Sequence, residues 1–457
     1  MSTQPARGMR DFLPEDVRRR DYVVGIIREV YDRYGFEPLE TPAAENIETL
    51  LGKYGEEGNK LVFKILKRGE HEASGQADLA LRYDLTVPFA RVVAEYQAKL
   101  PKIFKRYQIQ PVWRADRPAR GRFREFYQCD IDAIGSASPI VEAEQIAAVA
   151  EVLEKLKFSD FKIVVNHRGV LTGLLEAVEI AAEQHETALV ALDKLDKIGD
   201  KGVEAEFAER GIDPEKASRL MHMLRNIFAG QDLIAGKDGV MVSRARLDEL
   251  HAILDSTKHG TAVQNLSEIL SLVRSTSIAG HVYVDPGLAR GLSYYTGTIM
   301  EITVPDLPGS LGGGGRYDNL IGMFLGSDVP ACGFSLGLER ILMVMHERGM
   351  FPPQVESSSV DVVVAALNEN ACEAAFQTAI ELRRAGGLRV DLYPESAKMD
   401  KIFKYVDLRN AKFIAILGSD EVANGTVTLR NVKARTKEVV RRAEAPALIR
   451  LAMTASK

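Results

Sequence analysis

The chain has 457 residues, of which 46% are hydrophobic and 27% charged, and its formal net charge is −5. These values are typical of a globular protein of about three domains and exclude disordered, collagen-like and disulfide-scaffold classes. No apolar run approaches the roughly eighteen residues that cross a bilayer and the start lacks a signal-peptide core, so we expect a cytoplasmic protein without a membrane partner. Cys129, Cys332 and Cys372 form no CxxC pair, which fits a reducing compartment and argues against structural zinc.

Charge is distributed unevenly along the chain. Residues 358–457 carry 16 Lys and Arg against 12 Asp and Glu, whereas the remainder carries 43 against 52. A basic C-terminal region indicates a polyanionic partner such as a nucleic acid. An excess of four charges is also common on a solvated surface, so both interpretations stay open.

Periodicity divides the first 350 residues into elements. A helical stripe covers 15–34, and the two-proline stretch 36–42 must be extended but cannot be a central strand throughout. Alternating, aromatic-rich runs at 103–114 and 123–134 predict an antiparallel pair of strands joined by a basic loop. The pattern continues with a helix at 138–156, a strand at 162–166, helices across 170–273, and strands at 281–284 and 298–304.

The last hundred residues follow a different pattern. After a linker-like stretch near 350–359, short apolar strands alternate with helical patterns, a βαβαβ order that predicts a parallel sheet covered by helices. The strands are expected at 360–367, 389–393 and 412–418, the helices at 369–386 and 398–409, and a strand at 426–432 and a helix at 443–451 follow.

Two glycine motifs invite functional interpretations. Gly309–Gly315 lacks the ending of a phosphate-binding P-loop, which leaves a flexible turn or a ligand-covering loop. Gly333–Gly337 spells GxSxG, the nucleophile motif of α/β-hydrolases, around Ser335. The only later histidine, His346, is one helix along on the same element and cannot fold back onto Ser335, so tight strand-to-helix packing explains these glycines better.

Charged side chains concentrate in the loop between the two long strands and beside it. Arginine forks suit phosphate oxygens, although a solvated hairpin rim is the alternative for Arg114, Arg117, Arg120, Arg122 and Arg124. On the second strand, period two places Gln128, Asp130 and Asp132 on one face, and Arg82, Asp84 and Thr86 share a face if their segment is extended. Buried carboxylates near arginines are costly without a ligand, which favours a site over a core.

Arg340 falls in the first turn of a predicted helix, 338–346, where the helix dipole disfavours a cation unless an anion faces it. A ligand phosphate would supply that anion, and so would Glu339 or another carboxylate. The eight histidines form neither HExxH nor HxxxH, so metal ligation by histidine is not supported.

Taken in order, these segments resemble class II aminoacyl-tRNA synthetases, and specifically the histidyl-tRNA synthetase family. The class-wide carriers are Pro42, Val112–Pro118, Gly121–Asp130 and Gly337–Arg340. Two further stretches are typical of the histidine enzymes alone, Arg290–Gly297 and Gly314–Asp318. Within the first of these, Ser293 replaces the usual acid, which puts in doubt one hydrogen bond in the histidine pocket.

The resemblance implies an α+β fold with an antiparallel-sheet catalytic core, a helical insertion and a C-terminal α/β anticodon-binding domain. It implies a homodimer formed through the segment around Pro42. The expected layout is a catalytic core at 1–169 and 276–350, a helical insertion at 170–275, a linker at 351–359 and an anticodon-binding domain at 360–457.

The reaction implied is ligation of histidine to tRNA(His) through a histidyl-adenylate, with ATP as substrate and Mg²⁺ bridging its outer phosphates. By resemblance, Arg114 contacts the α-phosphate, Arg340 the γ-phosphate, and Arg290 lies by the α-phosphate, where other class II enzymes use a further metal ion. These three are the expected catalytic residues, and Arg122 is a further ATP-binding residue.

The same resemblance assigns the amino-acid site. Asp84 and Thr86 match positions that hold the amino group, and the histidine pocket includes Gln128, Asp132, Tyr294 and Tyr295. A non-catalytic regulatory paralogue is the alternative, but such relatives typically lack the anticodon domain and lose catalytic arginines.

Overall fold

The computed structural model describes residues 3–69, 74–228, 239–289, 294–356, 360–385 and 387–455. The chain divides into two compact units, Met1–Phe351 and Pro352–Lys457, and each is described by itself. Among the described residues, no helix is both long and apolar enough to cross a membrane.

An eight-stranded sheet forms the centre of the first unit, in the order β1-β5-β6-β11-β10-β9-β7-β8. All neighbours are antiparallel except the pairs β1–β5 and β7–β8. In this order the strands are Glu37–Pro38, Phe104–Trp113, Glu125–Ile134, Ala331–Gly337, Ser310–Arg316, Thr298–Thr303, Lys162–His167 and Val282–Val284. The predicted antiparallel pair is therefore confirmed as β5 and β6, and the proline-containing stretch lies at the sheet edge.

The glycine-rich segment is part of this sheet. Ser310–Arg316 is strand β10, which pairs with β9 on one side and β11 on the other, so the predicted turn or loop is wrong. A Cβ atom added at Gly314 would collide with the carbonyl oxygen of Gly333 on the neighbouring strand. A Cβ atom at Gly312 or Gly315 would likewise come within 2.5 Å of a backbone oxygen, so the adjacent strands exclude side chains at these positions.

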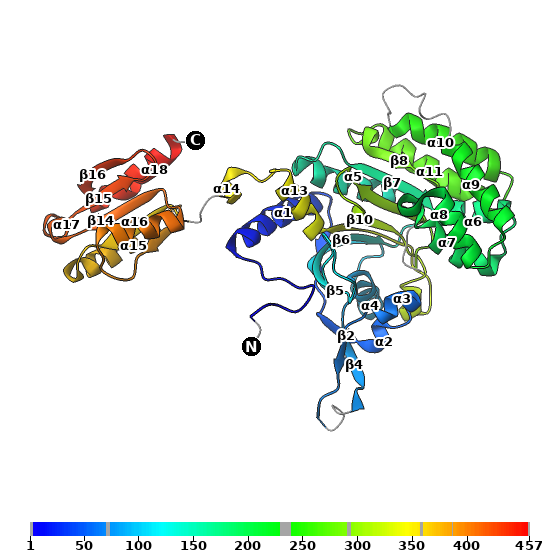
Figure 1. Cartoon of the computed structure of the whole chain (residues 1–457), viewed down its shortest axis with the longest axis horizontal. Helices are drawn as coiled ribbons and strands as arrows, with labels where there is room; N and C mark the ends of the chain where they lie inside the picture. Colours follow the sequence, from blue (N-terminus) through cyan, green and yellow to red (C-terminus); the bar gives the residue numbers. More distant parts are fainter. Residues whose placement is uncertain are drawn as a thin grey trace. The chain divides into compact units, whose positions relative to one another are not determined.

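Helices cover both faces of the large sheet. On one side lie α1 (Pro14–Arg33), α5 (Ile140–Lys155) and α13 (Leu338–Glu347), and on the other lies α4 (Thr86–Tyr96), as Figure 1 shows. Side chains of alternate residues therefore meet different helices, since successive residues of a strand point to opposite faces. On the α4 side, the guanidinium of Arg106 lies 4.4 Å from the ring centre of Phe89.

The residues that precede α4 in the sequence form a smaller sheet, in the order β2-β4-β3. The remaining short elements of this region are β2 (Ala44–Asn46), α2 (Ile47–Leu50), α3 (Gly55–Lys60), β3 (Lys64–Leu66), β4 (Ala77–Leu81) and α12 (Gly322–Leu325).

The segment between β4 and α4 is not extended, so one predicted shared face does not exist. β4 ends at Leu81 and α4 begins at Thr86. The Arg82 guanidinium bonds to the backbone oxygens of Thr41 and Pro111, at 2.6 and 2.9 Å. The Asp84 carboxylate instead accepts the Val87 N–H at 3.0 Å, in the first turn of α4. A carboxylate at a helix start is stabilised by the free N–H groups there, which separates Asp84 from Arg82.

The helical stretch predicted for 170–273 is confirmed over its described residues. It contains α6 (Arg168–Ala177), α7 (His185–Leu192), α8 (Leu195–Glu209), α9 (Pro214–Phe228), α10 (Gly239–Leu254) and α11 (Gly260–Arg274), with 3-10 turns at Ala182–Gln184 and Ala279–His281. These helices, green in Figure 1, gather beside β7 and β8.

The second unit is a five-stranded sheet in the order β13-β12-β14-β15-β16. The predicted parallel arrangement is correct for β13, β12 and β14, whereas β15 and β16 pair antiparallel. The strands are β12 (Val362–Ala366), β13 (Val390–Leu392), β14 (Phe413–Leu417), β15 (Thr426–Asn431) and β16 (Thr436–Arg441). Apolar clusters cover both faces. The sequence did not predict β16, which is exposed and carries no apolar alternation.

Three of its helices match the predicted pattern: α15 (Cys372–Arg384), α16 (Met399–Arg409) and α18 (Ala445–Ala455). Two short helices were not predicted, α14 (Pro353–Glu356) in the expected linker and α17 (Ser419–Asn424), and 3-10 turns lie at Glu369–Ala371 and Arg442–Glu444.

Candidate active site

Asp84 is held by hydroxyl and backbone donors at the start of α4. Its Oδ1 accepts the Tyr54 hydroxyl at 3.1 Å and the Val87 N–H at 3.0 Å, and its Oδ2 accepts the Tyr294 hydroxyl at 3.3 Å. The Thr86 hydroxyl is in turn within hydrogen-bonding reach of Tyr294. Burial raises the pKa of Asp84 above its ordinary value, and these donors offset part of that rise. Three predicted site residues thus meet here, with Tyr54 added.

Asp132 lies on the polar face of β6, opposite Arg106 of β5. Its Oδ2 is 2.7 Å from the Arg106 Nη2, and its Oδ1 accepts the Tyr317 hydroxyl. Both partners are buried. Burial raises the pKa of Asp132, and the charge of Arg106 opposes that rise. Asp132, a predicted histidine-pocket residue, is therefore hydrogen-bonded at Oδ1, whereas its Oδ2 has an ion-pair contact but no hydrogen bond.

Gln128 and Asp130 complete the same face, next to Ser335 of β11. Gln128 Nε2 donates to the Ser335 Oγ at 2.9 Å. Ser335 thus lies within a strand and not at the strand-to-helix turn that a hydrolase nucleophile requires, and His346 is on α13. The role of this motif is packing and hydrogen bonding within the sheet.

Tyr295 belongs to the same cluster. Its ring centre is 5.2 Å from that of Tyr294, which lies 6.0 Å from the Tyr317 ring. Burial raises the pKa of Tyr295, with smaller contributions from Cys332, Asp130, Asp132 and Asp84. The predicted histidine-site residues on α4, β6 and the segment after 293 are therefore gathered at one place, on the α4 side of the sheet.

Arg114 lies at the end of β5, beside this cluster. Its Nε donates to the Tyr83 carbonyl oxygen at 2.9 Å, and its guanidinium stacks 4.3 Å from the Tyr83 ring centre. The charge of Arg114 acts on Asp84 and lowers its pKa. Among the described residues its two terminal nitrogens make no hydrogen bond, so they are available to a phosphate.

Arg122 and Arg340 lie around the loop that follows Arg114. Arg122 is exposed and pairs with Asp116 at 2.6 Å. Arg340 donates from Nη1 to the Ser310 carbonyl at 2.5 Å and from Nε to the Gly121 carbonyl at 3.3 Å. Arg340 thus connects α13 with β10 and with the basic loop.

Glu339 is not the anion that faces Arg340, which was the alternative to a ligand phosphate. Both of its carboxylate oxygens accept the Tyr127 backbone N–H, at 3.0 and 3.1 Å. Burial raises its pKa to about 7.

Two predicted residues are not placed. Arg290, the third expected catalytic arginine, and Ser293 lie outside the described residues. Among the described residues, no group of three or more His, Cys, Asp or Glu side chains is arranged to hold a metal ion.

Three residues of the site were not predicted from the sequence: Tyr54, Arg106 and Tyr317. Tyr317 falls inside the quoted Gly314–Asp318 motif, so its position was visible although its role was not. Arg106 and Gln108 lie on the same face of β5, and the pairing of β5 with β6 places Arg106 opposite Asp132. Tyr54 comes from a segment without periodicity, and no sequence signal pointed to it.

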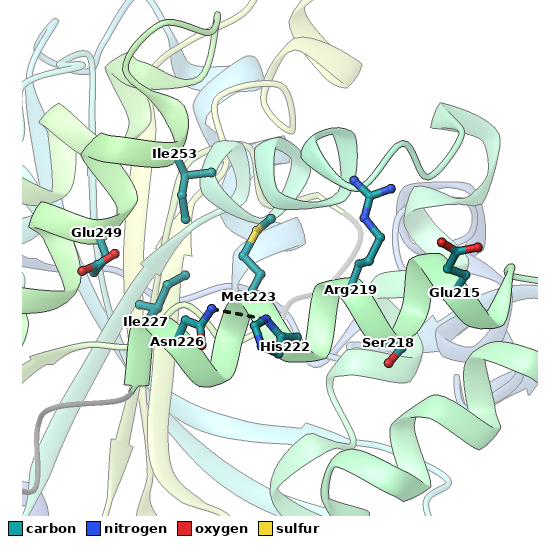
Figure 2. A pocket seen from close by; sticks show the side chains of 9 residues that line it. All are labelled: Glu215, Ser218, Arg219, His222, Met223, Asn226, Ile227, Glu249 and Ile253. Atoms are coloured by element: carbon teal, nitrogen blue, oxygen red, sulfur yellow. Dashed lines mark hydrogen bonds between the residues drawn. The ribbon is translucent and has the colours of Figure 1, made fainter.

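A hollow of about 680 Å³ lies elsewhere, on α9 and α10. Figure 2 shows its lining side chains, among them His222, whose ring nitrogen is 3.2 Å from Asn226 Nδ2. It contains none of the predicted site residues.

Comparison with known proteins identifies the chain's relatives. Residues 8–341 match the family profile described as Histidyl-tRNA synthetase. The chain belongs to the histidyl-tRNA synthetase family. Residues 361–451 match the profile described as Anticodon binding domain. The histidine–tRNA ligase of Gloeobacter violaceus is 38% identical, with 97% of each chain covered, and that of Christiangramia forsetii is 39% identical, with 95% and 96% covered.

Solved structures of the histidyl-tRNA synthetase family have the same fold. The histidyl-tRNA synthetase of Nostoc sp. PCC 7120 superposes with a TM-score of 0.79 at 30% identity, covering 98% of this chain and 99% of that one. A Bacillus halodurans protein described as an ATP phosphoribosyltransferase regulatory subunit/histidyl-tRNA synthetase gives 0.71 at 22% identity, covering 92% and 99%, a likeness of fold alone. The predicted α+β class II core with a C-terminal α/β domain is confirmed.

Proposed function

We propose that this protein ligates histidine to tRNA(His) in an ATP-dependent reaction through a histidyl-adenylate. The observation that carries the proposal is the match, over 97% of the chain, to a curated histidine–tRNA ligase. The clustered carboxylates and tyrosines beside Arg114 agree with it, because a site for a cationic amino acid next to a phosphate-binding arginine suits adenylation.

In the first step a carboxylate oxygen of histidine attacks the α-phosphorus of ATP, and the bond to the β-phosphate breaks to release pyrophosphate. Arg114 holds the α-phosphate, Arg340 the γ-phosphate, and Arg122 turns from Asp116 to the outer phosphates. Arg290 adds a second positive charge at the α-phosphate. In the second step a hydroxyl of the terminal tRNA ribose attacks the histidyl carbonyl carbon and AMP leaves. The arginines act by positioning and by stabilising developing charge.

The histidine itself is held by residues of the tyrosine and carboxylate cluster. Asp84 and Thr86 receive the α-ammonium group, and Gln128, Asp132, Tyr294 and Tyr295 line the imidazole side. Asp84 retains unused acceptor capacity, since a carboxylate offers about four lone-pair sites and three donors occupy it. A site built from such acceptors rejects isosteres that lack ring N–H donors.

Mg²⁺ enters as part of the nucleotide substrate, bridged by the outer phosphates and completed by water. Arg114, Arg122 and Arg340 would hold the phosphates to which the ion binds.

The layout proposed is a catalytic core at 1–169 and 276–350, a helical insertion at 170–275, a linker at 351–359 and an anticodon-binding domain at 360–457. The anticodon-domain match and the basic excess of that region support tRNA as its partner. Assembly as a homodimer and a cytoplasmic location complete the proposal. Three free cysteines, two of them buried, fit a reducing compartment.

Histidine-dependent exchange of labelled pyrophosphate into ATP tests the first step, and charging of tRNA(His) tests the second. Exchange well above a blank without histidine is expected. No exchange above that blank would favour the regulatory-paralogue alternative, and exchange driven better by another amino acid would overturn the substrate.

A further inference from the structure

Strand β6 presents a second carboxylate to the site, and the proposed function gives it no task. Asp130 is flanked on the same face by Gln128 and Asp132 and is only 2% exposed. Asp132 accepts the Tyr317 hydroxyl at Oδ1, and its Oδ2 makes an ion pair with Arg106 but no hydrogen bond. Asp130 Oδ1 is buried and has neither a hydrogen-bond partner nor an ion-pair partner among the described residues.

Ser335 fixes both Asp130 and its neighbour. It lies directly across from Asp130 in the β6–β11 pairing, receives the Gln128 Nε2 donor at 2.9 Å, and hydrogen-bonds to the Asp130 carboxylate. Gln128 is left with a buried Oε1 that likewise has no partner among the described residues. One serine thus orients two side chains and leaves one free acceptor oxygen on each.

On β5, Gln108 pairs with Asp130 and Gln110 with Gln128, but the Gln108 amide nitrogen already donates to Thr41 Oγ1 at 3.0 Å and to Gln110 Oε1 at 2.6 Å. On β11, Gly333 and Gly337 flank Ser335 on the same face, and Gly313 of β10 pairs with Ser335 from the other side. A buried acceptor without a donor costs about 1–3 kcal/mol, so two adjacent ones are retained where a ligand supplies the donors. Burial raises the pKa of Asp130, and Asp132 adds to that rise, whereas the charge of Arg106 and the hydrogen bond with Ser335 oppose it.

We propose that Asp130 is a further specificity-determining residue, whose free carboxylate oxygen accepts the imidazole N–H of bound histidine beside the free amide oxygen of Gln128. This inference rests on the proposed function. Asp132, which contacts Arg106 and Tyr317, lies beside it on the imidazole side of the site. Asp130 Oδ1 can accept the ring N–H without breaking the ion pair that Asp132 makes with Arg106.

The test compares Asp130→Asn and Ser335→Ala with the unaltered full-length protein in histidine-dependent pyrophosphate exchange. Asp130→Asn should raise the KM for histidine at least 10-fold and leave the KM for ATP within 2-fold. Ser335→Ala should raise the KM for histidine about 3- to 10-fold, because it frees both acceptors to rotate. Gln145→Met is the matched control, since Gln145 bonds to the Cys332 carbonyl beneath the same strand, away from the site.

Inhibition by β-(2-thienyl)alanine, which has no ring N–H, identifies the group that Asp130 recognises. The preference for histidine over this analogue should fall at least 10-fold in Asp130→Asn, and the thermal midpoint should not fall, because a buried charge is removed. An unchanged preference would assign Asp130 to the ammonium group and overturn the inference.

Other outcomes separate the inference from the function on which it rests. An unaltered protein inactive with histidine overturns the proposed function. An active protein whose histidine KM moves less than 2-fold in Asp130→Asn overturns the inference alone. If Asp130→Asn is not obtained folded, an unchanged histidine KM in Ser335→Ala has the same meaning.

Discussion

Asp130 in the large sheet and Asp361 in the C-terminal sheet are both only 2% exposed, but their surroundings differ. Asp361 accepts the Arg389 guanidinium at 3.0 and 3.1 Å, the Arg389 backbone N–H at 3.0 Å and Lys412 Nζ at 3.2 Å. These donors hold its pKa below the ordinary value, despite an opposing effect of burial. Burial without sufficient donors raises the pKa of Asp130.

The difference indicates what each carboxylate is for. A buried charge with a full set of donors stabilises its own domain, and losing a donor exposes the cost of burial. A buried charge with a free oxygen costs stability until a ligand binds, which is typical of a functional site. The buried Asp130 carboxylate therefore lowers the stability of the first unit until a ligand binds, whereas the buried Asp361 carboxylate stabilises the second unit.

The largest effect is expected from Arg114→Ala. The guanidinium would stabilise charge that develops at the α-phosphate, so kcat for pyrophosphate exchange should fall about 1000-fold or more. The thermal midpoint of the first unit should move by only a few degrees, because Arg114 is half-exposed. Arg389→Ala is the contrasting variant, expected to lower the stability of the second unit while exchange stays within 2-fold. Comparable exchange losses in both variants would contradict the distinction between the two regions.

Asp361→Asn should destabilise the second unit by about 2 kcal/mol, because an amide oxygen accepts less well from Arg389 and Lys412. Differential scanning calorimetry should show the transition of this unit moving down. The only tryptophan, Trp113, is in the first unit, so fluorescence reports the unfolding of that unit. The fluorescence transition should not move, because the substitution is in the second unit. A stable Asp361→Asn protein would show that these contacts are not structural.

Local sequence patterns predicted most strands of the two sheets and failed at a few identifiable segments. The alternation of β5 and β6 and the βαβαβ order of the second unit follow from which faces are buried, so both could be predicted. β10 could not, since glycine has low strand propensity and the close approach of β9 and β11 is a tertiary property. The face that Arg82, Asp84 and Thr86 would share in an extended segment does not form, because Asp84 instead accepts the Val87 N–H in the first turn of α4.

The site was predicted where its residues sit in motifs, as with Arg114, Gln128 and Tyr294. It was missed where the chain brings a side chain from a distant segment without a pattern, as Tyr54 shows. Which carboxylates already have partners is invisible in the sequence, because Asp130 and Asp132 look alike there. Only the pairing of β6 with β5 and β11 separates them.

The two carboxylates also predict opposite dependences of stability on pH. The pKa of Asp130 is raised from about 4 to about 7, so the folded state binds the proton more tightly and stability falls as pH rises across that window. Its contribution should be about 2–3 kcal/mol between pH 5 and pH 8, measured by urea unfolding with Trp113 fluorescence as the difference between the unaltered protein and Asp130→Asn.

The lowered pKa of Asp361 works the other way, because its stabilisation is present above about pH 4 and is lost as the pH falls below that value. The calorimetric transition of the second unit should therefore fall on acidification, and less so in Asp361→Asn. Identical pH dependence of the unaltered protein and Asp130→Asn between pH 5 and pH 8 would remove the contrast.

The smallest effect is expected from Tyr54→Phe, which removes one of the three donors to Asp84 and keeps the ring contact with Tyr83, whose centre is 4.6 Å away. A single hydrogen bond to a charged group contributes about 1.5 kcal/mol, and the Val87 N–H and Tyr294 remain, so the KM for histidine should rise only about 3- to 10-fold with kcat nearly unchanged. Pyrophosphate exchange at varied histidine measures this, and Tyr83→Phe, which keeps the same ring pair, is the control. A larger loss, with kcat falling as well, would mean that Asp84 depends on Tyr54 for its orientation, so that even the best-supplied carboxylate of the site is held less firmly than Asp361.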